Sequence, residues 1–290
     1  MELSRYSLLP TEWESYLIFV TYFLPPLAAT FIRTRRPEAV AQTGDALTDR
    51  AYALAMQHGG DTNYEGFKTL DAEWEFLAAA LPRLLQGDNG RLQRVCDRLD
   101  TFLDFTGRWD EEIWLCEQAE ERALAAGDKD NAGWRAYQAG MTYSIRNQAA
   151  EEVLDCAVRA STHWEDSAPR EKAAAFRLRG IGYELQKDYP TAIGFYRKAF
   201  EIWRNISSES DNVASVLGDI ATAEHKNKDH TSAEHDYREA LRIEKKNNNQ
   251  EGVAIRTGDL ANLALDREQW AEAETLAREA LALAEKNRAR

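Results

Sequence analysis

The sequence has few cysteines, and none stands where two could act together. Only three occur in 290 residues, at Cys96, Cys116 and Cys156. They are odd in number, lie far apart and form no C-x-x-C pair, which argues against a disulfide framework and against a structural zinc site. We predict that all three are small apolar residues inside helices, in a reducing cytoplasm.

Proline and strand-like patterns are also scarce. Seven prolines interrupt the 290 residues, and well-formed alternating runs of Val, Ile and Thr are missing. Ala, Leu, Glu, Arg and Lys dominate most of the chain, a composition that is typical of helices. The predicted fold class is therefore all-α.

Positive charge is in deficit as well. The chain has 36 Lys and Arg against 49 Asp and Glu, which gives a net charge of −13 and an isoelectric point near 5.0. Such a charge disfavours contact with phosphate backbones or anionic lipid through a broad electrostatic field. We therefore expect no nucleic acid among the partners.

Signatures of catalysis and of cofactor binding are missing too. No G-x-x-x-x-G-K-[ST] occurs, and no serine stands at a strand-to-helix elbow. His225, His230 and His235 are spaced by five positions, so a continuous helix would not place them on one face as a metal pair requires. With 49 carboxylates, any chosen pair is more often solvated helix surface than an acid and base. We predict no enzyme activity, no bound metal and no cofactor.

One apolar stretch stands apart, at residues 16–32. It has 17 residues without a charge, two adjacent prolines, Pro25 and Pro26, in its middle, and three arginines just after it. A membrane span needs roughly 20 apolar residues and two prolines would break or kink its helix, while a secretory signal would need a basic start and a clear cleavage site. The pattern favours a buried hairpin or a docking segment over membrane association, so residues 1–36 form a separate apolar segment.

What the sequence does have is a repeat of about forty residues. Between residues 176 and 199 a large residue, a small one and an aromatic precede an A-x-x-x-Y pair. The small position recurs at Gly140, Gly180, Ala221 and Ala261, and an alanine later in each repeat recurs at Ala119, Ala160, Ala199, Ala240 and Ala280. Small residues let two helix axes approach closely, and aromatics fill the adjacent gaps. This spacing resembles the tetratricopeptide family over residues 91–290, which implies about five stacked antiparallel helix pairs in a right-handed superhelical solenoid.

The repeat is longer than the usual period of about 34 residues. We assign the extra residues to polar loops and N-caps between units, such as 207–212 and 247–252. Upstream the period fades, and the predicted helices 37–58 and 70–85 form an irregular leading pair within residues 37–90. At the other end, the helix 270–290 has no further helix to cover its outer face. Either its charged residues suffice as a cap, or this end meets another molecule, self-association included.

A second resemblance covers less of the chain. The runs LDAEW and AAAL within residues 70–81, with FLDFTGRW at 102–109, resemble the junction where helical repeats begin in bacterial signal-transducing NTPases with numerous domains. The repeats of those proteins form a C-terminal sensor arm, but no nucleotide-binding loop can be carried over here. Two functions thus stay open: a non-catalytic scaffold that binds a peptide or protein segment, and a regulatory arm of such an NTPase system supplied as a separate chain.

The tetratricopeptide resemblance also implies where a partner would bind. First helices of the repeats line the concave face, and residues three before, one after and four after the small position point to it. Among the residues selected in this way are Tyr137, Met141, Arg177, Ile181, Glu184, Thr222, His225 and Asn262. The set lacks the lysine and asparagine rows with which some members clamp a terminal carboxylate.

Tryptophans are numerous, with eight in the chain. Trp109 and Trp270 follow the turn of their repeats, and we expect both to pack in the core. Trp134, Trp164 and Trp203 are less constrained by the pattern. An exposed one would be an anchor for a partner, because aromatics supply binding energy at interface centres.

Overall fold

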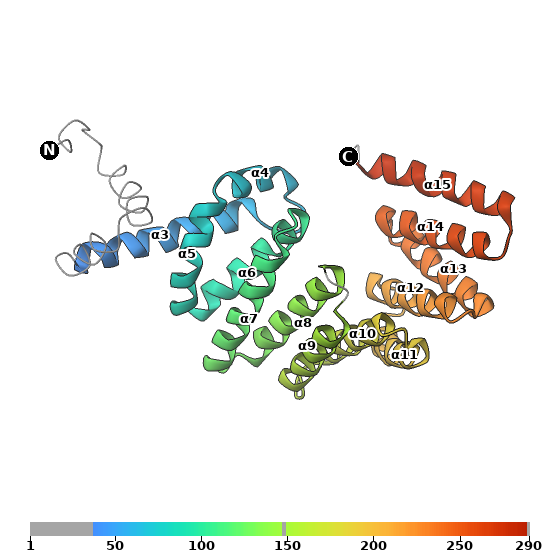
Figure 1. Ribbon diagram of the computed structural model, residues 1–290, viewed down its shortest axis with the longest axis horizontal. Helices are drawn as coiled ribbons and strands as arrows, with labels where there is room; N and C mark the ends of the chain where they lie inside the picture. The colour runs from blue at the N-terminus through green and yellow to red at the C-terminus, as the bar shows by residue number, and fades with distance from the viewer. Residues whose placement is uncertain (1–36, 147–148, 289–290) are drawn as a thin grey trace. The chain divides into compact units, whose positions relative to one another are not determined.

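The computed structural model describes residues 37–146 and 149–288, which form thirteen α-helices and no strand (Figure 1). The chain divides into two compact units, unit 1 up to Ala126 and unit 2 from Gly127. The helices of unit 1 are α3 (Pro37–His58), α4 (Tyr64–Ala72), α5 (Trp74–Gln86), α6 (Asn89–Phe105) and α7 (Trp109–Ala125). Those of unit 2 are α8 (Lys129–Arg146), α9 (Ala150–His163), α10 (Pro169–Leu185), α11 (Tyr189–Ile206), α12 (Asp211–Lys226), α13 (His230–Lys246), α14 (Gln250–Asp266) and α15 (Trp270–Arg288).

Unit 2 is a stack of four helix pairs, α8–α9, α10–α11, α12–α13 and α14–α15, drawn from green to red in Figure 1. Most contacts between helices join neighbours in sequence, within a pair and from one pair to the next. The first helices α8 and α10, and likewise α12 and α14, also touch. The predicted all-α solenoid is confirmed, and its stability is close to a sum of nearest-neighbour interactions.

The predicted small positions mark the closest approaches between helices. The alanines at 160, 199 and 240 are completely buried. At Gly180 an added Cβ would lie 2.4 Å from Cε1 of Tyr196, and at Gly140 it would lie 2.7 Å from Cδ2 of Leu178. These glycines are therefore required by packing rather than by backbone conformation, as the repeat pattern predicted.

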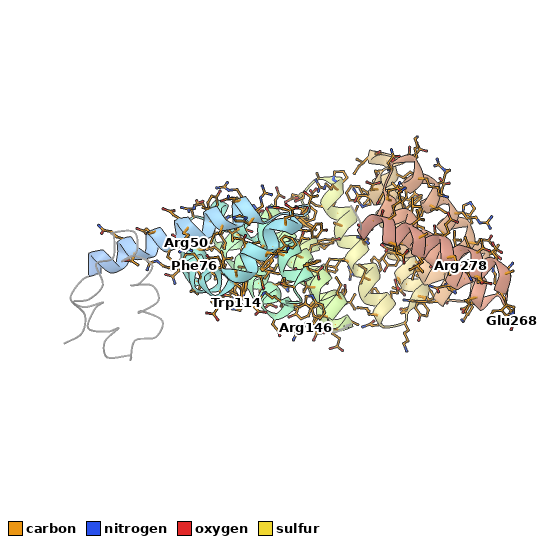
Figure 2. All side chains as sticks on the ribbon, turned by 90° about the horizontal axis from the view of Figure 1, so that it is seen from above. Arg50, Phe76, Trp114, Arg146, Glu268 and Arg278 are labelled. Carbon is orange, nitrogen blue, oxygen red and sulfur yellow. The ribbon has the colours of Figure 1, made fainter. Side chains whose placement is uncertain are left out.

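The turns inside the last three pairs share one geometry. After α10, α12 and α14 the chain passes through Lys187, Lys228 and Glu268, with φ of 62°, 67° and 60° (Glu268 is labelled in Figure 2). The next N–H bonds back to the helix, as from Asp188 to the carbonyl of Tyr183 at 3.0 Å. This is the six-to-one bond of the Schellman motif, in which glycine is the usual left-handed residue. Three of these turns thus hold a side chain where glycine would cost less.

Of the stretches that were assigned to loops between pairs, residues 207–210 and 247–249 are loop, whereas α12 already begins at Asp211 and α14 at Gln250. Ser210 caps α12 and Asn249 caps α14, each accepting a hydrogen bond from the backbone N–H three residues ahead. In the loop before α12, Glu209 accepts a hydrogen bond from Arg242 Nη1 at 2.8 Å and another from Lys246. The loop is therefore fastened to the end of α13, in the following pair.

Unit 1 packs α3 to α7 around one core and corrects one prediction. The predicted helix 37–58 is α3, but the single helix predicted over 70–85 is wrong, because α4 and α5 meet at Glu73. A straight helix would hold residues seven apart about 10 Å from each other along its axis. The break brings both Phe67 and Trp74 against Phe102, at ring-centroid distances of 5.6 and 5.8 Å. Glu73 itself pairs with Arg50 of α3 at 2.9 Å (Arg50 is labelled in Figure 2).

The predicted domain limits remain predictions. The repeats were expected to begin at residue 91, in α6, and α6 packs on α7, whose Ala119 is completely buried. Both helices belong to the first compact unit. The apolar stretch 16–32 and the rest of the segment 1–36 lie outside the described residues. Within 37–146 and 149–288, no helix is long and apolar enough to cross a membrane.

The tryptophans after the turns differ from each other. Trp109 is half-buried and its Nε1 donates to Asp104 at 3.1 Å. Trp270 was expected in the core, and this prediction is wrong, because the residue is 63% exposed. Its equivalents Tyr189 and His230 are partly covered. Each of those has a further helix pair beside it, whereas α15 is the last helix that the structure describes.

Candidate functional site

The candidate site lies on the first-helix face of unit 2, which we define as the face formed by α8, α10, α12 and α14. The structure places the predicted residues as follows: Tyr137 and Met141 on α8, Arg177, Ile181 and Glu184 on α10, Thr222 and His225 on α12, and Asn262 on α14. None of the eight residues is buried, and Asn262 is exposed. Their accessibility agrees with a position on a surface. Their contacts differ from one residue to another.

Three of the predicted residues form ion pairs between successive first helices. Arg177 Nε lies 2.5 Å from Oδ2 of Asp219, and Glu184 Oε1 lies 2.8 Å from Nζ of Lys226. The negative charge of Asp219 raises the pKa of Arg177 above its usual value. These side chains hold α10 on α12, so part of the predicted binding set has an established structural role.

Glu184 is engaged through both carboxylate oxygens. While Oε1 faces Lys226, Oε2 accepts a hydrogen bond of 2.7 Å from the hydroxyl of Tyr196. Burial raises the pKa of Tyr196, which keeps this hydroxyl protonated and donating. A partner could reach Glu184 only by competing with both contacts, so this residue shapes the surface more than it offers a free group.

The third link joins α12 to α14. His225 Nε2 lies 3.0 Å from Oδ2 of Asp266, and Lys228 Nζ lies 3.5 Å from the same oxygen. The hydrogen bond from His225 lowers the pKa of Asp266. The carboxylate is thus charged at neutral pH, shared between an imidazole and an ammonium group.

A cavity of about 450 Å³ opens beside this link and gathers three predicted residues, Thr222, His225 and Asn262. Its other lining residues are Tyr189, Lys226, Lys228, Tyr237, Asp259 and Asp266. Tyr189 and Tyr237 belong to second helices and Lys228 to a turn. The rule implied by the tetratricopeptide resemblance selects residues of first helices alone, so it could not select Tyr189, Tyr237 or Lys228. Tyr137 and Met141 do not line this cavity.

Tyr137 belongs to a separate aromatic cluster around α8. Its ring centroid lies 5.6 Å from that of Trp134 and 6.3 Å from that of Trp164. Trp164 is completely buried, and its Nε1 donates to the carbonyl of Asp130 at 3.2 Å. Trp134 is partly buried and Trp203 is 8% exposed. None of these three tryptophans is an exposed anchor.

Behind the cavity, Arg256 connects two carboxylates of different exposure. Its Nη1 lies 2.8 Å from Oδ2 of Asp259, and its Nε lies 3.7 Å from Oε1 of Glu244. Glu244 is 3% exposed, and burial raises its pKa to about 7. A Cβ on Gly218 of α12 would lie 2.2 Å from Nη1 of Arg256, so the glycine makes room for the arginine.

These side chains can hold polypeptide by hydrogen bonds and ion pairs, and they suggest little else. In the described part of the chain, no group of three or more His, Cys, Asp or Glu could hold a metal ion. The rings of His225 and His230 meet edge to face at 5.5 Å, with no further histidine or cysteine beside them among the described contacts. Asn262 offers an amide with no hydrogen-bond partner among the described residues.

The comparisons with known proteins agree with the repeat register. The family model described as Tetratricopeptide repeat matches residues 171–246 and 212–286. No curated protein matches this sequence.

Solved structures share the fold at low sequence identity. The chain is similar to BtubC (BKLC) from P. vanneervenii, with 15% identity, 77% of this chain and 93% of that chain covered, and a TM-score of 0.60. It is similar to a Rap protein complexed with Competence and Sporulation Factor, with 11% identity, coverage of 84% and 76%, and a TM-score of 0.61. For aspartyl phosphate phosphatase F from Bacillus subtilis the values are 13%, 95%, 73% and 0.57.

At these identities the similarity concerns the fold alone. The family match, however, falls on the same register of small residues, turns and helix pairs that the structure shows from α10 to α15. The family match therefore identifies residues 171–286 as tetratricopeptide repeats, and the solved structures show the same helical repeat fold.

Proposed function

We propose that this chain is a non-catalytic protein-interaction module that holds a polypeptide segment on the first-helix face of unit 2. Repeat solenoids present extended surfaces of this kind, and their usual role is to bind other proteins. The similar Rap protein was solved in complex with Competence and Sporulation Factor, which supports a polypeptide ligand by analogy of fold.

The observation that carries the proposal is the cavity beside Asn262. It combines an exposed, unpartnered amide with the hydroxyls of Thr222 and Tyr237, which lie 3.0 Å apart. A side-chain amide can donate to a peptide carbonyl and accept from a peptide N–H at once. The cavity therefore suits the backbone of an extended or helical segment, with the ion pairs of His225 and Lys226 at its rim.

The ion pairs decide which residues can test the proposal. Replacing Arg177 by glutamate would place a second carboxylate against Asp219 and damage the α10–α12 contact itself. Asn262 has no such structural contact, so its removal should leave the fold intact. Asn205, an exposed asparagine on the second helix α11, is a matched control.

The test places a photo-crosslinking amino acid at position 262 or at position 205 of the full chain in its native cells. We expect a crosslinked partner at 262 and none at 205, identified by mass spectrometry. Asn262→Ala should then weaken retention of that partner by the purified chain, whereas Asn205→Ala should not, with equal helicity in both. Equal crosslinking at the two positions, or none at 262, would refute the assignment.

A further inference from the structure

The contact between a second helix and the first helix of the next pair, which we call a joint, has a recurring buried residue. It stands four positions after the buried alanines at 160, 199 and 240. At the first two joints of unit 2 it is Trp164, directly after α9, and Trp203 of α11, which are 0% and 8% exposed. At the third joint, between α13 and α14, it is Glu244, which is 3% exposed. A buried carboxyl therefore stands where the other joints have an indole.

The opposite side of each joint differs in the same way. Ala175 of α10 lies in one apolar cluster with Trp164, and Val216 of α12 lies in another with Trp203. In the repeat register both correspond to Arg256 of α14, five positions before the small residue. The joint between α13 and α14, which are neighbours in Figure 1, is thus ionisable on both sides, whereas the two joints before it are apolar.

The carboxyl of Glu244 has few partners for a buried charge. Its Oε1 lies 3.7 Å from Nε of Arg256, which is longer than a hydrogen bond, and its Oε2 has no hydrogen-bond partner among the described residues. The other charged groups that face it, Asp259 of α14 and Asp211 of α12, are both acidic. Such a site favours the neutral form, and burial raises the pKa of Glu244 to about 7, although Arg256 acts in the opposite direction.

The cavity of the candidate site straddles the same joint. Thr222 and Tyr237 line it from α12 and α13, whereas Asp259 and Asn262 line it from α14. Nη1 of Arg256 lies 2.8 Å from Oδ2 of Asp259, so the guanidinium that faces the buried carboxyl also holds one wall of the cavity. A change in the docking of α14 on α13 therefore changes the cavity as well.

We propose that the joint between α13 and α14 is a pH-sensitive switch of the cavity, closed while the carboxyl of Glu244 is protonated and loosened when it ionises. The regulation of partner binding by this switch rests on the proposed function of the cavity. The behaviour of the joint itself does not depend on it, so the two can be tested separately.

The direction of the switch follows from the cost of a buried charge. Ionisation of Glu244 places a negative charge beside Asp259 and Asp211, with Arg256 as the one cation that faces it. The neutral carboxyl therefore stabilises the closed joint fully at a pH below the pKa of this group in the open joint. This contribution is lost as the pH rises through 7. Since α14 loses its packing when the joint opens, and a helix of this length does not persist alone in water, opening of the joint unfolds α14 locally.

A second contact joins the same two helix pairs at the other end of α14. Asp266 lies 3.0 Å from Nε2 of His225 and 3.5 Å from Nζ of Lys228. The side chains of Lys228 and Asp266 are 72% and 45% exposed, and ion pairs in water contribute little to stability. Because His225 is also titratable, a substitution at Glu244 is needed to separate the two contributions.

Hydrogen exchange of the full chain, followed by mass spectrometry at pH 6 and pH 8, measures the opening without any partner. The exchange rates are corrected for the intrinsic effect of pH. In the open joint Glu244 is in water, where its pKa returns to the ordinary 4.5, so the open population should rise about tenfold between pH 6 and pH 8. The peptide 250–259 reports the joint, and the peptide 260–266 reports the part of α14 beside the cavity. The start of α10, whose joint contains Trp164, should show no such rise and serves as the internal reference.

Two variants assign the effect to one carboxyl. Glu244→Gln has the shape of the protonated side chain and cannot ionise, so it should remove the rise in both peptides. Glu251→Gln removes an exposed carboxyl from the first turn of the same helix and should behave like the parent.

A parent without the rise, or a Glu244→Gln chain with the same rise, would overturn the switch. A rise in 250–259 with constant protection of 260–266 would overturn its control of the cavity. Failure of crosslinking from position 262 would instead refute the proposed function, while the exchange result would still decide whether the joint responds to pH.

Discussion

Replacing Gly180 by alanine tests whether the small positions of the repeat are dictated by packing. The new Cβ would lie 2.4 Å from Cε1 and 2.5 Å from Cδ1 of Tyr196, roughly 1 Å inside an ordinary carbon contact. The ring cannot swing away, because Tyr196 is 1% exposed and its hydroxyl donates to Glu184 at 2.7 Å. Overpacking of this kind costs about 1–3 kcal/mol.

A matched control separates this cost from the effect of alanine on the helix. Alanine stabilises a helix by about 0.5–1 kcal/mol relative to glycine, and this gain is common to every such exchange. Gly194 of α11 is exposed, and a Cβ there would have no neighbour within 4 Å. Gly194→Ala should therefore stabilise the protein by about 0.5–1 kcal/mol, whereas Gly180→Ala should destabilise it by up to about 2 kcal/mol.

The assay is urea unfolding followed by far-UV circular dichroism, with both variants compared with the parent at one protein concentration. The difference between the two variants, about 1–3 kcal/mol, is the steric cost of the methyl group at Gly180. If the two variants move in the same direction by similar amounts, the close approach of α10 and α11 does not require glycine, and the packing argument for the repeat pattern is wrong.

Three further predictions concern the turns, the buried carboxyl and the tryptophans. Lys187→Gly should stabilise the chain by about 1 kcal/mol in urea, because its φ of 62° is strained for a side chain, whereas glycine at the exposed helical Lys172 should cost about as much. Burial raises the pKa of Glu244 in the folded protein to about 7. Its contribution to the free energy of unfolding is therefore fully present at a pH below the pKa of this carboxyl in the unfolded chain, and it is lost as the pH rises through 7. Glu244→Gln should therefore stabilise the protein relative to the parent by about 1–3 kcal/mol near pH 8 and by much less near pH 4, measured by urea unfolding at both; an equal difference at both would contradict the raised pKa. Trp164→Ala should cost about 3–5 kcal/mol, because the side chain is completely buried, whereas Trp270→Ala should cost less than about 0.5 kcal/mol in dilute solution.

Much of the fold could be predicted because packing that repeats from pair to pair requires small residues at regular intervals in the sequence. The glycine and alanine rows mark the sites where helices touch, so their spacing revealed the register of unit 2. The break at Glu73 left no such trace, since neither glycine nor proline stands there and the contacts that accompany it, with Phe102 and Arg50, are tertiary. Trp270 was misjudged for a related reason, because burial at its position depends on a neighbouring pair and not on the residue itself.

The site was predictable only in part. The rule taken from the family resemblance selected residues of first helices, and three of them, Thr222, His225 and Asn262, line one cavity. It could not show that Arg177 and Glu184 form ion pairs with the neighbouring first helix, because each partner stands 42 positions away, on the next repeat. The resemblance of residues 70–109 to the sensor arms of signal-transducing NTPases stays a prediction.

The ion pairs between first helices also determine how far the repeats are interchangeable. If the pair α12–α13 were excised so that α14 followed α11, residues 40 positions further on would take the places of those removed. Arg177 would still meet a carboxylate, with Asp259 in the place of Asp219, but Glu184 would face Asp266 where Lys226 had been. One contact survives the deletion and the other becomes a repulsion. The repeats therefore share one backbone arrangement, but the ion pairs between their first helices match only in the present order of the repeats.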